Sequence, residues 1–158
     1  MENDGNVRQM RFVETTLAAP EQAFALVADI ERHGEWSPQE FEASRVGDGP
    51  IGVGATYRTA GRKGARKGVM RATDVIVTEY VPPSRFAFEA TEAAGTYRTT
   101  FVISPEGTGS RVERIVDPPT RGAVPFIRHR LLAPVVRAYV RQNMVALKAH
   151  LDAGAPPA

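Results

Sequence analysis

The 158-residue chain carries a formal net charge of +2, and its length favours one domain with a core of its own. Apolar residues make up 42% and charged residues 24%, which is ordinary for a soluble globular protein. The chain has no cysteine, which excludes disulfides, thiol nucleophiles and cysteine-ligated metals. The first ten residues lack the basic and apolar regions of a signal peptide, and no apolar run reaches the ~18–20 residues of a membrane span. We therefore expect a cytoplasmic protein.

A strand and a short helix are predicted at the start of the chain. Residues 7–17 are rich in β-branched side chains, which favours a strand. Pro20 suits the first position of a helix, and Phe24 and Val27 then recur at helical spacing.

The only tryptophan follows a second short helix. Asp29 is placed to cap a helix over residues 30–33, and Gly34 is predicted to stop it. Trp36 then falls in a polar stretch with the character of a loop, although large aromatic side chains are usually mostly buried. Two interpretations stay open for Trp36, a structural plug or a wall that contacts a ligand.

Successive strands are predicted from Phe41 to Asp117, separated by stretches rich in glycine, proline and serine. The intervals between these strands hold no helix. Parallel neighbours need a crossover of about a dozen residues, so the strands should pair as antiparallel hairpins. With the first strand, we expect a twisted sheet of about seven strands.

Alternation assigns faces to some of these strands but leaves two ambiguous. Phe86, Phe88 and Ala90 share one face, as do Tyr97, Thr99, Phe101 and Ile103. Neither parity of residues 69–80 is cleanly apolar. In residues 111–116, placing Val112 and Val116 inside also places Arg114 inside.

The last predicted element is a long helix over residues 125–152. Its apolar stripe consists of Val136, Val140, Met144, Leu147 and Leu151. Pro134 should kink this helix or begin its main part. We expect one domain over residues 1–152 and a disordered tail over residues 153–158.

A helix with one apolar stripe and a sheet with one apolar face are best buried against each other in two layers. The prediction is therefore an α+β fold in which a curved antiparallel sheet wraps around the C-terminal helix. A curved sheet and a cylindrical helix fit imperfectly, so an apolar cavity for a small ligand is expected between them.

The order of these elements resembles the START-like superfamily, also called SRPBCC, which includes polyketide cyclase/dehydrase-like and lipid-transport domains. The resemblance covers almost the whole chain. It rests on "AP" with Phe24 four residues after Pro20, "VADIERHGEW", "EYVPPSRFAF", and Asn143 followed by "LK". It implies a helix-grip fold, but this fold serves carriers, hormone receptors, cyclases and co-chaperones alike.

Motifs for cofactors, metals and covalent catalysis are weak. "GDGPIG" over residues 47–52 matches G-x-G-x-x-G, but Pro50 and Gly54 lead into another strand rather than a helix, so a hairpin loop is predicted. The three histidines, His33, His129 and His150, have no metal-ligand spacing. No nucleophile-elbow sequence is present. We expect neither a metal nor a cofactor.

The candidate cavity-lining residues are aromatic and polar side chains spread along the chain. They are Phe24, Trp36, Tyr57, Phe86, Phe88, Tyr97, Phe101, Arg114, Tyr139 and Asn143. Proton-moving candidates are Tyr97, Arg114, Tyr139, Asp74 and Asn143.

Arg114 and Asn143 each have two interpretations. An inward Arg114 would hold a carboxylate or an enolate through paired N–H donors, whereas an outward one would be a surface residue. Asn143 is either a ligand contact or a structural hydrogen bond to the short-helix segment.

Basic residues cluster in two tracts. Residues 58–71 contain six bases and no acid, and residues 118–151 contain no acid. Such tracts are most often solvated faces, and we expect no nucleic-acid binding. If Arg128, Arg130, Arg137 and Arg141 share an exposed face, the helix would be able to rest on an anionic membrane.

Three functions stay open from the sequence. The first is binding of a small hydrophobic molecule, such as a lipid, a polyketide or an aromatic metabolite. The second is a cofactor-free cyclase, aromatase or dehydratase, and an inward Arg114 with a second titratable group nearby would favour it. The third is a regulatory or protein-interaction module, which a large exposed apolar patch would favour. The sequence does not define the ligand or the oligomeric state.

Overall fold

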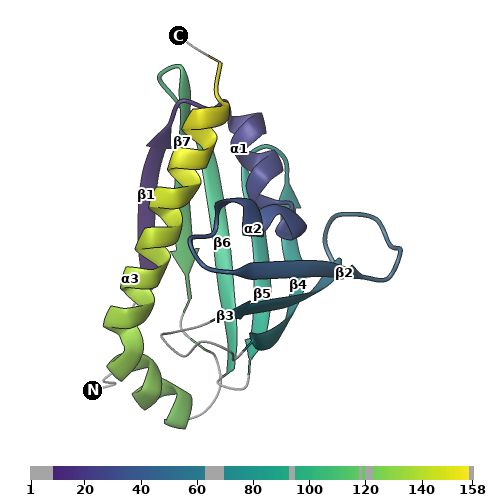
Figure 1. Cartoon of the computed structure of the whole chain (residues 1–158), viewed down its shortest axis with the longest axis vertical. Helices are drawn as coiled ribbons and strands as arrows, with labels where there is room; N and C mark the ends of the chain where they lie inside the picture. The colour runs from purple at the N-terminus through teal and green to yellow at the C-terminus, as the bar shows by residue number, and fades with distance from the viewer. Residues whose placement is uncertain (1–8, 63–69, 93–94, 118, 120–122, 157–158) are drawn as a thin grey trace, which may run out of the picture.

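The computed structural model describes residues 9–62, 70–92, 95–117, 119 and 123–156, with the side chains of 62, 70–72 and 123–130 left out of the description. Seven strands and a long helix dominate the fold (Figure 1). The strands are β1 (Met10–Thr16), β2 (Phe41–Val46), β3 (Thr56–Arg62), β4 (Met70–Val81), β5 (Arg85–Glu92), β6 (Gly95–Glu106) and β7 (Gly109–Val116). The helices are α1 (Pro20–Val27), the 3₁₀ turn η1 (Ile30–Arg32), α2 (His33–Trp36) and α3 (Ala123–Gly154).

All seven strands form one antiparallel sheet in the order β1-β7-β6-β5-β4-β3-β2. Helix α3 packs along β1, α1 lies over β5, β6 and β7, and α2 contacts β2 and α3 (Figure 1). The predicted α+β fold, a curved seven-stranded sheet with a C-terminal helix and short helices after the first strand, is confirmed.

The short-helix segment differs from the prediction in two ways. Gly34 does not end a helix, because α2 begins at His33 and continues to Trp36, and Asp29 makes no side-chain capping bond. Gly34 is instead needed for close approach, since a Cβ atom there would lie 2.6 Å from the backbone oxygen of Phe41. This contact packs α2 against the start of β2 and places Trp36 on a helix rather than in a loop.

A bulge explains the ambiguous pattern of β4. Val75 and Val77 are buried and face the core, but the register with β5 shifts between Val77 and Glu79. The extra residue, Thr78, moves the core-facing position to Tyr80, which packs on the core. The apolar positions therefore change parity within one strand.

Helix α3 buries the predicted stripe. Val140, Met144, Leu147 and Leu151 are buried, and Val136 packs against the core from a half-buried position. Pro134 lies inside the helix, and the amino-terminal turns stand at an angle to the rest (Figure 1).

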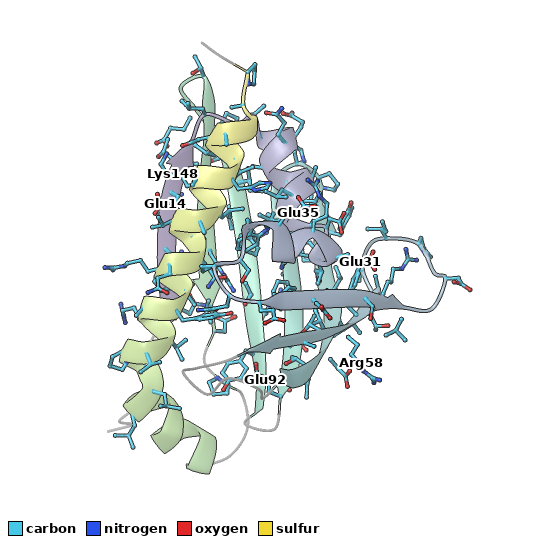
Figure 2. The ribbon with its side chains drawn as sticks, in the orientation of Figure 1. Glu14, Glu31, Glu35, Arg58, Glu92 and Lys148 are labelled. Carbon is cyan, nitrogen blue, oxygen red and sulfur yellow. The ribbon has the colours of Figure 1, made fainter. Side chains whose placement is uncertain are left out.

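Asp152 fastens the last turns of α3 to the end of β1. Its carboxylate accepts hydrogen bonds from Thr16 Oγ1, Leu17 N–H and Lys148 Nζ, each at 2.8 Å. Lys148 also donates to the Thr15 carbonyl, and Figure 2 shows its side chain over β1. These bonds fix the helix on one edge of the sheet.

No helix in the described part of the chain is both long enough and apolar enough to cross a membrane.

Candidate functional site

An aromatic wall covers the inner face of the central strands. Phe86 and Phe101 are fully buried and face each other across β5 and β6. The Phe86 ring lies 5.8 Å from that of Phe88 and 6.3 Å from that of Tyr80. Phe24 of α1 meets Tyr80 edge-to-face at 5.3 Å. The predicted candidates Phe24, Phe86, Phe88 and Phe101 thus form one continuous surface.

Arg114 lies on this inner face. It occupies the position on β7 between buried Val112 and Val116, opposite Phe12 on one side and Phe101 on the other. Its guanidinium carbon lies 5.4 Å from the centre of the Phe101 ring. Its Nε atom is buried without a hydrogen-bond partner. Burial lowers the pKa of Arg114 to about 10, and the nearby Tyr139 hydroxyl acts in the opposite direction.

His33 is the residue that the sequence interpretation missed. Its ring is buried, and its Nε2 lies 2.8 Å from the Val27 carbonyl oxygen. Because a carbonyl only accepts, Nε2 must carry the proton, which leaves Nδ1 of the neutral ring as an acceptor. Burial, the largest cause, and the charge on Arg114 together lower the pKa of His33 to about 4, although the hydrogen bond with Val27 acts in the opposite direction. His33 is therefore neutral at pH 7.

The spacing of buried residues in this segment carries a signal for His33. Ile30, His33 and Trp36 follow one another at intervals of three, and all three are buried. This interval places side chains on one face of a tight helical turn, so the three could have been grouped from the sequence.

Trp36 turns inward beside His33. It is 5% exposed, and its ring centre lies 5.0 Å from that of His33. The His33 ring also lies 6.1 Å from Phe41 and 6.3 Å from Phe88. The indole Nε1 of Trp36 is buried and has no hydrogen-bond partner. Trp36 thus joins the short helices to the aromatic wall and offers an unused donor.

Helix α3 brings Tyr139 and Asn143 to the same core. Tyr139 is half-buried against the core, and Asn143 is buried beside Met144. Asn143 Nδ2 donates to the Tyr139 carbonyl oxygen at 2.8 Å. The predicted structural hydrogen bond exists, but it stays within α3 instead of reaching the short helices.

The remaining polar candidates lie further along the sheet. Tyr57 of β3 is buried opposite Val75, and burial raises the pKa of its hydroxyl. Tyr97 is half-buried opposite Ala90.

Asp74 does not belong to the interior. Its side chain is 72% exposed and pairs with Arg58 at 3.2 Å on the outer face of the sheet. Figure 2 shows Arg58 at the surface, far from α3. The prediction that Asp74 moves protons inside the fold is therefore wrong.

The "GDGPIG" stretch connects β2 to β3, as the hairpin-loop prediction required, and Gly47 and Gly52 have positive φ angles. His150 is partly exposed and lies 3.7 Å from Glu35. Among the residues that the structure describes, no group of three histidine or acidic side chains is placed to hold a metal ion.

The arrangement combines an apolar wall with donors that the fold leaves unpaired. Trp36 and Arg114 each supply an N–H group, and neutral His33 lies in ring contact with the first and within the electrostatic reach of the second. Such a surface is suited to holding an apolar molecule by its body and a polar atom of that molecule by hydrogen bonds.

Solved structures share this fold at low sequence identity. TTHA0849 from Thermus thermophilus has a TM-score of 0.72 and 19% identity, covering 94% of this chain and 100% of that one. CV1439 from Chromobacterium violaceum has a TM-score of 0.68 and 20% identity, covering 92% and 98%. StfQ, a di-domain ARO/CYC from the steffimycin biosynthetic pathway, has a TM-score of 0.73 and 11% identity, covering 92% of this chain and 50% of that one.

No curated protein resembles the chain closely enough to count as a match. A family model does match, and it covers residues 10–152, from the first residue of β1 to the last turns of α3. The chain therefore belongs to the polyketide cyclase/dehydrase and lipid transport family.

Proposed function

We propose that the protein binds a small hydrophobic molecule between the inner face of the sheet and α3. The observation that carries this proposal is the pair of buried, unpartnered donors on Trp36 and Arg114 beside an aromatic wall. A buried polar group without a partner costs about 1–3 kcal/mol, so such groups commonly mark a place where another molecule completes the bonding. Membership of a family named for polyketide chemistry and lipid transport supports the same function.

Native mass spectrometry of freshly purified protein tests the proposal. We expect a co-purifying small apolar mass, or binding of members of a panel of fatty acids, sterols and flavonoids. Because Trp36 is the only tryptophan, its fluorescence should change on binding. Empty spectra together with no response across the panel would contradict ligand binding.

A cofactor-free cyclase, aromatase or dehydratase is the second candidate. It is favoured by neutral His33, whose Nδ1 is free to accept a proton, near the cationic Arg114. In this mechanism Arg114 holds an enolate oxygen and His33 takes the proton from carbon. StfQ, a similar fold, is an ARO/CYC protein of a biosynthetic pathway.

Incubation with a short poly-β-ketone thioester, followed by chromatography and mass spectrometry, tests this candidate. Faster formation of cyclised or dehydrated product than with His33→Gln protein is expected. Equal rates of product formation with the unaltered protein, with His33→Gln protein and with buffer alone would contradict this candidate.

We also propose a contact between α3 and anionic membrane, because the outer face of this helix is basic and apolar at once. A groove of about 630 Å³ on this face is lined by Pro134, Arg137, Ala138, Arg141, Gln142, Val145, Ala146 and Ala149. Leu131 and Val135 are 74% and 65% exposed nearby. The side chains of Arg128 and Arg130, and most of the basic tract 58–71, lie outside the described residues.

Each arginine near an anionic surface contributes roughly 1 kcal/mol. Sedimentation with phosphatidylserine vesicles at low salt should therefore fall in an Arg137→Glu, Arg141→Glu double variant but not in Arg58→Glu. Absence of vesicle binding by the unaltered protein would overturn the membrane contact. Together with a ligand-free interior, it would favour a protein-interaction module.

A further inference from the structure

Two of the unpartnered groups in the interior are pure donors. In the described part of the chain, four buried side-chain polar atoms lack a partner: Trp36 Nε1, Arg114 Nε, Gln39 Oε1 and Thr78 Oγ1. An indole N–H and a guanidinium N–H cannot accept a hydrogen bond. Whatever completes the bonding of Trp36 and Arg114 must therefore present an acceptor.

The positive charge of Arg114 restricts the chemical class of this acceptor further. No carboxylate lies within ion-pair distance of Arg114 among the described residues, and its guanidinium lies over the Phe101 face. Arg114 is half-buried and its Nε is fully covered. A cation partly removed from water without an opposite charge is costly, and a neutral carbonyl compensates only part of that cost. Arginine pairs best with oxyanions, because its planar fork matches their geometry.

The groups that surround His33 keep its ring uncharged beside Arg114. Its ring is surrounded by the Val27 carbonyl, the rings of Trp36, Phe41 and Phe88, and the positive field of Arg114. His33 is neutral there and supplies no competing positive charge. Arg114 is thus the cation to which an incoming anion would be drawn.

We propose that the bound molecule ends in an oxyanion, a carboxylate, phenolate or enolate, which Arg114 and Trp36 hold while the apolar body lies against the half-buried rings of Phe88 and Tyr80 in the aromatic wall. This inference rests on the proposed ligand-binding function and names the chemical class of the ligand. It also explains why the fold here keeps a half-buried arginine, with its Nε fully covered, where the buried Val112 and Val116 are its neighbours on the inner face.

A matched pair of probes tests the inference. Decanoate and decanamide share the same chain and differ mainly in charge. By calorimetry at pH 7.5, we expect decanoate to bind at least tenfold more tightly than decanamide. In a ¹H–¹⁵N spectrum, the single indole N–H signal should move on adding decanoate, because Trp36 gains an acceptor.

Three variants test which residues produce the preference for decanoate over decanamide. Arg114→Met should abolish the preference for decanoate, Trp36→Phe should reduce it, and Arg58→Met, an exposed arginine on the outer face, should leave it unchanged. Free Arg114→Met protein should melt no lower than the unaltered protein, because a half-buried cation without an opposite charge has been replaced by an apolar side chain. If Arg114→Met does not fold, Arg114→Lys, which cannot offer an Nε–H, should weaken the preference instead.

The outcomes separate the two levels of the proposal. Equal binding of decanoate and decanamide, or an unchanged indole signal, would overturn the oxyanion inference while leaving hydrophobic ligand binding in place. Binding of neither probe, with no response across the wider panel, would overturn both.

Discussion

At the scale of single residues, burial sets the charge of the site. The His33 ring is surrounded by apolar rings, and Arg114 opposes a second positive charge. The pKa of His33 is therefore lowered to about 4, so this ring stays neutral where an exposed histidine would begin to charge. The site consequently keeps one cation across the neutral range.

This lowered pKa predicts a loss of stability in mild acid. The unfolded chain takes up the His33 proton near pH 6.5, whereas the folded protein takes it up only near pH 4. His33 therefore makes the free energy of unfolding fall as the pH drops from 6.5 to 4, by about 3 kcal/mol in total. Urea denaturation at pH 7 and pH 4.5 would measure most of this fall.

In the variant His33→Gln, the free energy of unfolding should lack the fall of about 3 kcal/mol between pH 6.5 and pH 4, because an amide still donates to the Val27 carbonyl but does not titrate. His150→Gln, which removes a partly exposed histidine, is the matched control and should keep the full dependence. An equal pH dependence in the unaltered protein and His33→Gln would show that His33 does not titrate as described.

The inward position of Arg114 could be anticipated from parity, since the buried valines on either side place it inside. The lack of a hydrogen-bond partner for Arg114 Nε could not be anticipated, because it depends on which side chains from α2, β6 and α3 reach the Arg114 guanidinium. His33 escaped prediction for a similar reason. Its neighbours along the chain are charged, and only the packing of η1 and α2 on the sheet buries it.

At the scale of elements, the junction between α2 and β2 depends on the absence of one side chain. Gly34→Ala would place a Cβ atom 2.6 Å from the Phe41 backbone oxygen. In an unobstructed helix the same change stabilises by about 1 kcal/mol. We expect it here to lower the free energy of unfolding by about 1–3 kcal/mol, measured by chemical denaturation.

Gly49→Ala is the matched control for this change. Gly49 has open space around it and no positive φ, so its substitution should alter stability by less than about 0.5 kcal/mol. If both variants unfold at the same denaturant concentration, the close contact with Phe41 does not limit position 34.

The Asp152 carboxylate is the second junction whose contribution can be measured. Its hydrogen bonds with Lys148, Leu17 and Thr16 lower its pKa to about 2. Asp152→Ala should lower the free energy of unfolding by about 1–3 kcal/mol at pH 7. Glu42→Gln, an exposed change on β2, should have little effect.

The pH dependence of that difference has a definite sign. Asp152 contributes its full stability above the ordinary aspartate pKa of 3.8, and the contribution disappears as the pH falls through about 2. Thermal melts of unaltered and Asp152→Ala protein should therefore converge between pH 4 and pH 2. A gap that persists at pH 2 would contradict the assignment of these bonds.

Element types were largely predictable because each follows a local period. The stripe of α3 and the alternation of β5 and β6 are examples. Strand β4 shows where the local pattern fails, since the bulge at Thr78 changes parity and is fixed by pairing with β5. The prediction of where α2 ends was also wrong, because the role of Gly34 depends on its contact with Phe41 rather than on its neighbours in the sequence.

At the scale of the whole molecule, the two-layer arrangement followed from counting one amphipathic helix and a series of hairpins, and the family resemblance gave the same result. Which polar residues meet in the interior could not be predicted from the sequence, because Trp36, Arg114 and Tyr139 come from α2, β7 and α3. Residues so far apart in the chain are brought together by sheet order, which no local pattern encodes.

The sheet order has a consequence for synthesis. Strands β1 and β2 follow each other in the chain yet form the opposite edges of the sheet, and among the described strands β1 pairs with β7 alone. During translation the first strand to leave the ribosome must therefore wait for nearly the whole sheet before it can pair. In that interval its core-facing Met10 and Phe12 have no sheet partner, so β1 completes its pairing only after β7 has been synthesised.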